Sequence, residues 1–318
     1  MPSPKTLEPS RVAVLIPCYN EETTVGSVVR DFRAVLPAAA IYVFDNASTD
    51  ATATEAENAG AAVVFSPQPG KGHVVRHMFE SVDADWYLMV DGDATYPAAA
   101  APEMLERAIS GRMDMFSGRR RTPESDLRAA YRPLHQWGNR LVCCLIRKAF
   151  GSPIDDVFSG YRAFSRNFVK TVPLHSSGFQ IEVEMTLQAL SKGYRVGEMD
   201  VPYGARPAGS HSKLNTYSDG LLVLTAFVSI CRDYRPGLFF GFAALALALL
   251  SLISGAPALA DYWIYQYVYH VPLALLATGL GILSALCLCV ALILKTQLRY
   301  HNELHSFLRR GFRQEKPE

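Results

Sequence analysis

Two acidic residues one position apart, Asp91 and Asp93, are the chain's clearest sign of chemistry. They follow the apolar run 86–90, which indicates a buried strand that delivers carboxylates to the edge of a sheet where open α/β folds bind ligands. Carboxylate oxygens suit Mg²⁺ or Mn²⁺, and these ions commonly hold substrate phosphates as well. An Asp-rich turn without a metal is the alternative, because Asp and Gly are ordinary turn residues.

Alternating strand and helix patterns predict the elements that position this pair. We expect strands over residues 11–17, 41–44, 62–65, 86–90, 113–117 and 194–201, and helices over 21–36, 51–59, 70–82, 98–110 and 127–150. This alternation predicts an α/β fold, with a mostly parallel sheet and helices on both faces.

Polar residues close to the ends of the first four strands are candidates for a nucleotide-binding edge. They are Pro17, Tyr19, Asn20, Glu21, Asp45, Lys71, Asp91 and Gly92. Right-handed crossovers would bring them together, with acids in the diphosphate region, so we expect a divalent ion to hold the diphosphate. These loops contain neither G-x-G-x-x-G nor G-x-x-x-x-G-K-[ST], which counts against dinucleotide oxidoreductases and P-loop NTPases.

Six motifs, in this order, resemble those of family 2 glycosyltransferases, most closely the polyprenyl-phosphate branch that includes dolichyl-phosphate mannose synthase-like enzymes. The motifs are Pro17-Cys18-Tyr19-Asn20-Glu21-Glu22, Asp45-Asn46-Ala47-Ser48-Thr49-Asp50, Gly70-Lys71-Gly72, Asp91-Gly92-Asp93, Ser117-Gly118-Arg119 and Asp156-x-x-Ser159-Gly160-Tyr161-Arg162. The resemblance implies a GT-A fold, metal ligation by Asp91 and Asp93, and inverting transfer of a sugar from a nucleotide to a lipid phosphate.

The chain departs from this family pattern at three positions. Asn46 and Ala47 replace the second acid and the glycine of an Asp-Asp-Gly-Ser motif, which leaves Asp45 as the candidate for contact with the base. Thr95 stands where dolichyl-phosphate mannose synthases have Gln, and its hydroxyl would be a weaker metal ligand. The donor therefore stays open: a UDP-hexose or UDP-HexNAc is favoured, and GDP-mannose is the alternative.

Basic residues beyond the fifth strand are candidates for binding an acceptor phosphate. Arg119 is placed to form two hydrogen bonds to a phosphate, although the run 119–121 could also be a solvated turn. The resemblance completes the acceptor set, which is Arg119, Arg132, Gln136, Arg162, Arg206 and Lys213. We interpret the last two as part of a lid over residues 206–213, for which a plain linker is the alternative.

Asp156 is the acid of the last motif, and its role stays open. A hydroxyl acceptor would need it as a general base, whereas a phosphate with a second pKa of about 6 is already an anion at neutral pH. We favour a role in orienting the arginines or the sugar, which gives a catalytic set of Asp93, Asp156, Arg119 and Arg132. Of Glu182 and Glu184, at the start of a later helix, we expect at most one to reach the site.

Two segments without charge, residues 238–255 and 271–294, are close to the length of about 20 residues that a bilayer crossing needs. Basic residues lie before the first apolar segment and after the second, while Asp261 is the only acidic or basic residue among Asp, Glu, Lys and Arg in the loop 256–270. The positive-inside rule then predicts an integral protein of the inner membrane with its catalytic domain and both termini in the cytoplasm. The expected organisation is a disordered N-terminus (1–10), a GT-A domain (11–215), an interfacial helix (216–235), two transmembrane helices (236–295) and a basic tail (296–318).

Composition narrows the functional classes further. The chain has 31 Lys and Arg against 30 Asp and Glu, a balance that argues against nucleic-acid binding. Its six cysteines show no C-x-x-C spacing, which argues against a structural zinc site. Gly279 and Gly281 in the second apolar segment predict self-association into homo-oligomers.

The leading functional hypothesis is transfer of a sugar from a nucleotide sugar to polyprenyl phosphate at the membrane. A membrane polysaccharide glycosyltransferase that uses a sugar hydroxyl as acceptor is the enzymatic alternative. The non-enzymatic alternative is a scaffold subunit of a lipid-sugar translocation complex, which would have no need of paired acids at a strand edge.

Overall fold

The computed structural model describes residues 12–121, 154–178, 180–204 and 235–314, together with 139, 142–144, 146–148, 150–151 and 232. The chain divides into two compact units. One consists of Met1–Val223 with Leu308–Glu318, and the other is Leu224–Phe307.

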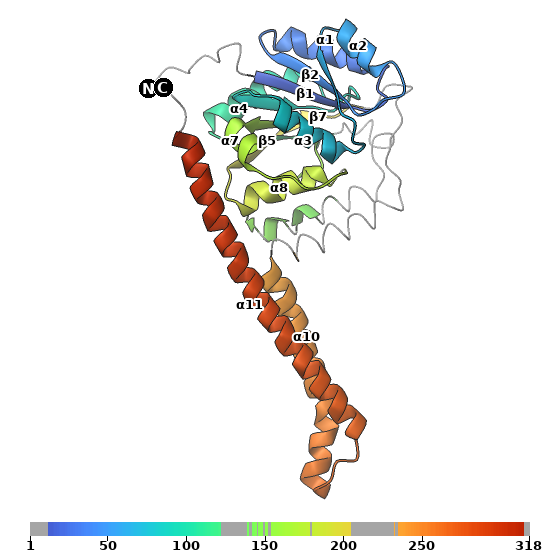
Figure 1. Ribbon diagram of the computed structural model, residues 1–318, viewed down its shortest axis with the longest axis vertical. Coiled ribbons are helices and arrows are strands. Elements are labelled where there is room, and N and C mark those ends of the chain that lie inside the picture. Colours follow the sequence, from blue (N-terminus) through green and yellow to red (C-terminus); the bar gives the residue numbers. More distant parts are fainter. Residues whose placement is uncertain are drawn as a thin grey trace. The chain divides into compact units, whose positions relative to one another are not determined.

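A seven-stranded sheet in the order β3-β2-β1-β4-β6-β5-β7 forms the centre of the first unit (Figure 1). The strands are β1 (Val12–Cys18), β2 (Ala40–Asp45), β3 (Ala62–Phe65), β4 (Trp86–Met89), β5 (Met115–Arg121), β6 (Arg162–Ser165) and β7 (Val196–Pro202). Neighbouring strands pair in parallel except at β6, which runs antiparallel to both β4 and β5. The mostly parallel α/β fold predicted from the sequence is therefore confirmed.

Helices cover both faces of this sheet. They are α1 (Val25–Val35), α2 (Thr52–Asn58), α3 (Lys71–Ser81), α4 (Ala101–Ser110), α7 (Arg166–Thr171) and α8 (Ile181–Ser191), with a 3₁₀ turn η2 (Ala98–Ala100) before α4. Alternation along β1 separates two cores, since Val14 packs with residues of α1 and α4, and Leu15 packs with residues of α3, α7 and α8. Successive strand residues thus fasten the sheet to both helical layers.

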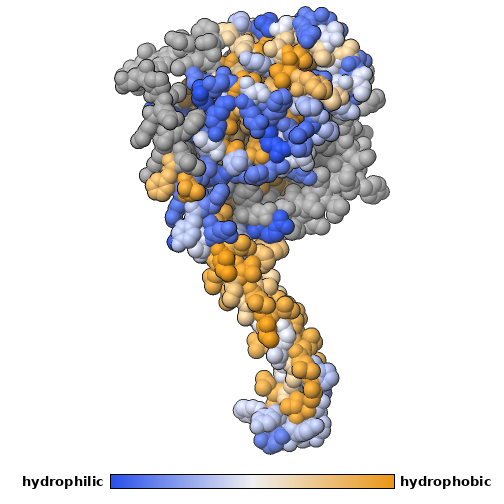
Figure 2. Space-filling model, in the orientation of Figure 1, coloured by the Kyte–Doolittle hydropathy of each residue, from blue (hydrophilic) through white to orange (hydrophobic). Residues whose placement is uncertain are grey.

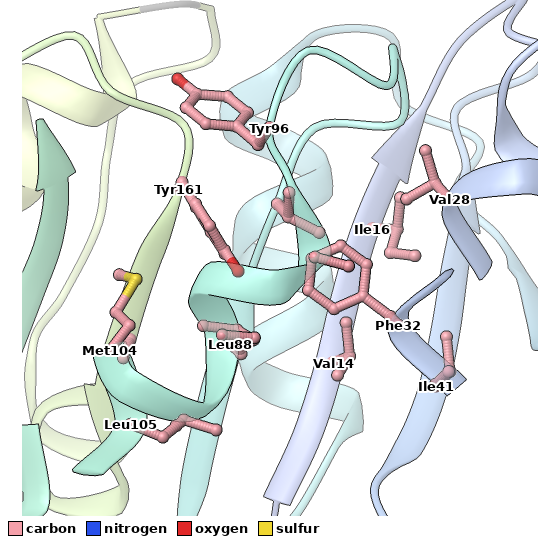
Figure 3. Packing of buried hydrophobic residues seen from close by; sticks show 14 of the residues in the cluster. Val14, Ile16, Val28, Phe32, Ile41, Leu88, Tyr96, Met104, Leu105 and Tyr161 are labelled. Carbon is pink, nitrogen blue, oxygen red and sulfur yellow. The ribbon is translucent and has the colours of Figure 1, made fainter. Parts of the chain in front are cut away.

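The core on the α1 and α4 side extends to the carboxyl edge of the sheet. Tyr161 lies edge-on to Phe32, with ring centroids 6.0 Å apart, and Tyr96 lies 5.3 Å from Tyr161 (Figure 3). Gly160 donates its backbone N–H to the Tyr96 hydroxyl at 3.1 Å. The aromatic packing therefore ties the loop after β4 to the segment that leads into β6.

The sequence analysis predicted neither β6 nor α7. β6 has only four residues and begins with an arginine, so it lacks the length and apolar alternation that reveal a strand. α7 is also short, and the Ser165 hydroxyl caps it by accepting a hydrogen bond from the Phe168 N–H at 3.2 Å.

The second unit contains two apolar helices, α10 (Pro236–Tyr265) and α11 (Val271–Gln314). Both are long and apolar enough to cross a membrane, and hydrophobic residues dominate their visible surface in Figure 2. The hydroxyl of Ser251 donates to the Ala277 carbonyl and that of Ser284 donates to the Ala244 carbonyl, each at 2.7 Å, which joins the helices as an antiparallel hairpin. The prediction of two apolar C-terminal helices is confirmed.

A carboxylate closes the tip of this hairpin. Asp261 Oδ2 accepts hydrogen bonds from the backbone N–H groups of Tyr269 and His270 at 2.9 and 3.0 Å, and lies 2.7 Å from His270 Nδ1. Apart from residues 232 and 235, the predicted interfacial helix (216–235) lies outside the described residues, as do residues 1–10.

Candidate active site

Loops that follow parallel strands converge on one edge of the sheet, and three of their residues have left-handed backbone conformations. Asn20 follows β1 with φ 52°, Ala47 follows β2 with φ 56°, and Ala94 follows β4 with φ 56°. This region is unfavourable for alanine, and such residues persist where the surrounding structure imposes them, often at functional sites.

Lys71, the first residue of α3, forms the electrostatic centre of this edge. Its Nζ lies 2.6 Å from Asp91 Oδ1 and 2.6 Å from Glu182 Oε1, and all three side chains are largely buried. Burial opposes its positive charge, but the two carboxylates prevail and raise the pKa of Lys71 above its ordinary value. Glu182 therefore reaches the site, whereas Glu184 accepts hydrogen bonds from the His175 and Ser176 N–H groups in a nearby loop.

Asp93 is buried and ordered by a local hydrogen-bonded turn. Its Oδ1 accepts hydrogen bonds from the Thr95 hydroxyl at 2.6 Å and from the Thr95 N–H at 3.2 Å. Thr95, expected from the sequence as a weak metal ligand, thus holds an aspartate in place in this structure.

Two glycines allow close packing at the acid pair and beside it. A Cβ on Gly160 would overlap Asp91 Oδ2, and a Cβ on Gly92 would lie 2.5 Å from Cys18 Sγ. No group of three His, Cys, Asp or Glu side chains able to hold a metal ion occurs among the described residues. Two carboxylates one residue apart, with Gly160 leaving space for Asp91, fit a Mg²⁺ or Mn²⁺ ion whose other ligands come from water or a substrate phosphate.

The loops after β1 and β2 are joined at the predicted nucleotide-binding edge. Asn20 N–H donates to Ser48 Oγ at 2.9 Å, and Asn20 Oδ1 accepts from Thr49 N–H at 2.8 Å. The Glu21 N–H donates to Thr52 Oγ1 at 2.8 Å. Asp45 is buried at the end of β2 and Tyr19 is exposed, while Pro17 lies in β1 opposite Phe44.

Asn46 explains one departure from the family pattern, because its amide fixes the loop that leads to Lys71. Its Nδ2 donates to the Ser66 and Gln68 carbonyls at 3.1 and 2.6 Å, and its Oδ1 accepts from the Gly70 N–H at 2.8 Å. A carboxylate could not donate the first two of these bonds. On the other side of this loop, a Cβ on Gly72 would overlap the Ser176 carbonyl.

Arg119 and Arg120 have different partners because successive residues of β5 point to opposite faces. Arg119 forms ion pairs with Asp155 and with Asp200. Arg120 contacts Asp156 Oδ2 through Nε at 2.7 Å and Oδ1 through Nη2 at 2.8 Å. Asp156 is thus paired with Arg120 in this structure, an arginine that the sequence analysis left out of the site.

Asp156 is held as an anion. Burial alone would raise the pKa of its carboxyl, but the charge and hydrogen bonds of Arg120 outweigh burial and lower that pKa below its usual range. The backbone N–H groups of Arg120 and Phe158 also donate to this carboxylate, each at 3.2 Å.

Glu198 of β7 is a further acid beside the site that the sequence analysis missed. It accepts hydrogen bonds from the Asp155 N–H at 2.9 Å and the Asp156 N–H at 3.3 Å. Burial, with the nearby charges of Asp156 and Asp155, raises the pKa of Glu198 to about 7. Only the pairing of β7 with β5 reveals this position, since a single Glu within a strand pattern carries no functional signal.

Arg162, predicted to bind the acceptor phosphate, is bonded to groups inside the protein in this structure. Its side chain is fully buried, and its guanidinium donates to the carbonyls of Ser159 and Val157 and to the Thr186 hydroxyl, at 2.6 to 2.9 Å. Its observed contacts fasten β6 to α8 and to the loop that carries Asp156. Four other predicted residues lie outside the described part of the chain, namely Arg132, Gln136, Arg206 and Lys213.

Comparison with known proteins agrees with this geometry. Residues 13–172 match the model of glycosyl transferase family 2. The glycosyltransferase AglJ of Haloferax volcanii is 33% identical over 277 residues, which cover 86% of this chain and 89% of AglJ. A dolichyl-phosphate hexose transferase of the same organism is 26% identical over 224 residues, covering 70% of this chain and 95% of that protein.

A crystal structure of Mycobacterium tuberculosis glucosyl-3-phosphoglycerate synthase in complex with Mn²⁺ and UDP-glucose shares the fold. Its TM-score is 0.57 at 19% identity, over 70% of this chain and 78% of that one. The similarity supports the GT-A architecture predicted from the sequence. With the family match over residues 13–172 and the relationship to AglJ, it follows that this chain belongs to glycosyl transferase family 2.

Proposed function

We propose that this glycosyltransferase moves a sugar from a nucleoside-diphosphate sugar to polyprenyl phosphate, with inversion at the anomeric carbon, on the cytoplasmic leaflet of a membrane. The observation that carries the proposal is the acid pair Asp91 and Asp93 at the end of the central strand β4, in a chain that ends in an apolar helical hairpin. The product would be a polyprenyl-phospho-sugar.

The donor half of the proposal rests on the residues at the strand edge. Asp91 and Asp93 would hold a Mg²⁺ or Mn²⁺ ion, which when bound acts as a Lewis acid on the leaving diphosphate. Asp45 and the joined loops after β1 and β2 would bind the nucleoside. The related synthase binds UDP-glucose with Mn²⁺, which supports a UDP-sugar here, with GDP-mannose as the alternative.

The acceptor half rests on the state of Asp156. Because Arg120 and two backbone N–H groups occupy its carboxylate and its pKa is lowered, it is a poor proton acceptor. A hydroxyl acceptor needs a base, whereas a phosphate monoester is an anion at neutral pH. The arrangement therefore favours a phosphate acceptor, as does the relative named dolichyl-phosphate hexose transferase.

In this scheme the chain's own residues position two anions for reaction. The residues that would bind the lipid phosphate are Arg119, Arg132, Gln136, Arg206 and Lys213. Asp156 would hold its own loop against β5 through its pairing with Arg120. Phosphate would exchange for Asp155 or Asp200 on the Arg119 guanidinium, since a phosphate accepts the same forked pair of hydrogen bonds as a carboxylate.

The hairpin of α10 and α11 would hold the catalytic unit at the membrane, where the lipid phosphate presents its head group. Basic residues at positions 232, 235, 295 and 299 flank the apolar segments, which supports a cytoplasmic location for both ends.

The test is an assay of the full-length protein in membranes that contain polyprenyl phosphate, with a panel of radiolabelled UDP- and GDP-sugars and MgCl₂ or MnCl₂. We expect one donor to give a lipid-linked product that mild acid releases as free sugar. In Asp91→Asn this product should fall at least about a hundredfold, because the substitution removes a charge from the leaving-group site.

Other outcomes would overturn this proposal. Label found in a polymer that resists mild acid would indicate a hydroxyl acceptor. Full product formation by Asp91→Asn would remove the acid pair from the mechanism and revive a non-catalytic role for this edge.

A further inference from the structure

Lys71 is paired with two acids, and only one of them belongs to the acid pair. Lys71 Nζ contacts Asp91 Oδ1 and Glu182 Oε1, both at 2.6 Å. The exposed fractions of the three side chains are 11% for Lys71, 26% for Asp91 and 5% for Glu182. Glu182 is therefore the more deeply buried partner, and Asp91 is the one that faces the site.

A divalent cation bound by Asp91 would repel the neighbouring ammonium group of Lys71. A buried ammonium that loses a counter-charge is destabilised, so a Lys71 without the Glu182 carboxylate would resist the arrival of a metal at Asp91 more strongly. Glu182 removes this obstacle, since Lys71 keeps one carboxylate partner when it withdraws from Asp91.

Helix α8 and the loop before it hold Glu182 beside Lys71. Glu182 belongs to the first turn of α8, and two residues later Glu184 binds the backbone at His175 and Ser176. The adjacent Ser177 carbonyl accepts a hydrogen bond from the Gly72 N–H at 3.0 Å, next to Lys71 itself. Residues at the start of α8 and just before it thus contact both the Gly72 backbone and the Lys71 ammonium group.

We propose that Glu182 is a positioning residue that draws Lys71 away from Asp91 and so tunes the affinity of the acid pair for a divalent cation. This inference rests on the proposed function only in taking Asp91 and Asp93 as the metal ligands. Glu182 acts through Lys71 and is not itself a ligand.

The experiment measures binding of Mn²⁺ alone, with no sugar nucleotide or lipid, to the purified full-length protein by electron paramagnetic resonance of the free ion. In Glu182→Gln, Lys71 keeps Asp91 but loses the second of these two carboxylates, so Mn²⁺ affinity should fall about tenfold or more. Glu182→Asp, which restores the charge on a shorter side chain, should recover part of the loss. Glu80→Gln, an exposed acid on α3, is the matched control and should bind Mn²⁺ as the wild type does.

The Glu182 carboxylate could also raise Mn²⁺ affinity directly, by attracting the cation with its negative charge. A double-mutant cycle separates this direct effect from an effect that passes through Lys71. In a Lys71→Met background, Glu182→Gln should change Mn²⁺ affinity by less than about threefold, because the side chain that connects the two acids is gone. If the full effect persists in that background, Glu182 acts through its own field and the inference is wrong.

Wild-type affinity in Glu182→Gln would also overturn the inference. If Glu182→Gln does not fold, Glu182→Asp takes its place, since wild-type affinity with a displaced carboxylate would contradict positioning. A wild-type protein that binds no Mn²⁺ would overturn the metal site and this inference together. Failure of every sugar donor would leave the Mn²⁺ result standing and count only against the proposed reaction.

Discussion

At the scale of single residues, the site depends on two glycines, which lack side chains, as well as on its charged residues. Gly160 leaves the Asp91 carboxylate its space, because a Cβ at this position would overlap Asp91 Oδ2. Gly92 allows the turn between the two acids to lie against Cys18 of β1. The Gly160 requirement also links the last family motif to the Asp91-Gly92-Asp93 motif, although the two are far apart in the sequence.

Gly160→Ala tests this steric requirement. The added methyl group must displace the Asp91 carboxylate, so we expect product formation to fall about a hundredfold, in line with the cost of a 1 Å misplacement in an active site. Gly204→Ala is the matched control, since its Cβ would lie an ordinary 3.7 Å from the Thr95 carbonyl. Equal losses in both variants would show that the effect does not arise at Asp91.

Asn46→Asp tests the role of the amide that replaces an acid of the family pattern. The substitution removes the donors to the buried Ser66 carbonyl and to the Gln68 carbonyl and adds a charge beside them, so we expect a loss of about 2 kcal/mol in unfolding free energy. Thermal unfolding in detergent measures the effect, and Asn58→Asp on the exposed side of α2 serves as control. Unchanged stability of Asn46→Asp would contradict the hydrogen-bond assignment of this amide.

At the scale of elements, the sequence predicted every strand of the sheet except β6, together with the edge on which the acids gather. The apolar runs of β1, β2 and β4 are mostly buried and leave a strong signal in the sequence. The other strands were predicted from their alternation with helical patterns. β6 was missed since it is short and starts with Arg162, whose buried guanidinium is satisfied by hydrogen bonds that no local pattern reveals.

The orientation of the site arginines could not be predicted for a related reason. The strand predicted over 113–117 is observed as β5 (Met115–Arg121), so the basic run lies within the strand. Arg119 and Arg120 therefore take opposite faces and different acids. Such an assignment depends on where pairing stops, which is decided by the partner strand β7 and not by the residues of β5 alone.

The link between β7 and the Asp155-Asp156 loop predicts a pH dependence of stability. The pKa of Glu198 is raised from 4.5 to about 7 in the folded protein. Between these values the native state binds more protons than the unfolded state, so the contribution of Glu198 is greatest below pH 4.5 and is lost as the pH rises through 7.

The measurement is the thermal midpoint of the wild type and of Glu198→Gln at about pH 5.5 and about pH 8, on either side of the raised pKa. The wild type should lose more stability than the variant over this interval, since the variant has no carboxyl group to ionise at this position. Asp85→Asn, a change at another carboxyl of the catalytic unit, controls for general charge effects. Parallel pH profiles for the wild type and Glu198→Gln would contradict the assignment.

At the scale of the whole molecule, an enzymatic unit with a mostly parallel sheet and a separate apolar hairpin belong to one chain. The hairpin uses small residues at its internal contacts, including Gly281, whose Cβ would lie 3.3 Å from Ser251 Oγ. Gly281 therefore serves the contact between α10 and α11, while Gly279 has no atom within 4 Å of its Cβ position among the described residues. Self-association through Gly279 stays a prediction.

The proposed orientation places the hairpin tip on the far side of the membrane from the catalytic unit. A cysteine introduced as Tyr267→Cys should react with a membrane-impermeant maleimide in intact cells, because this tip residue is 62% exposed. Glu80→Cys, and the exposed native Cys144, should react only after permeabilisation. Labelling of Glu80→Cys in intact cells would reverse the orientation.

The carboxylate at the hairpin tip bears on how the protein is made. Asp261 and the N–H groups that bind it lie within nine positions of one another, so their bonds can form as soon as this short stretch leaves the ribosome. The one acidic group of the turn would then meet lipid with Oδ2 already hydrogen-bonded, which would lower the barrier to translocation. If the hairpin inserts in this way, we expect its insertion to need only this local cap and to proceed before the next helix is complete.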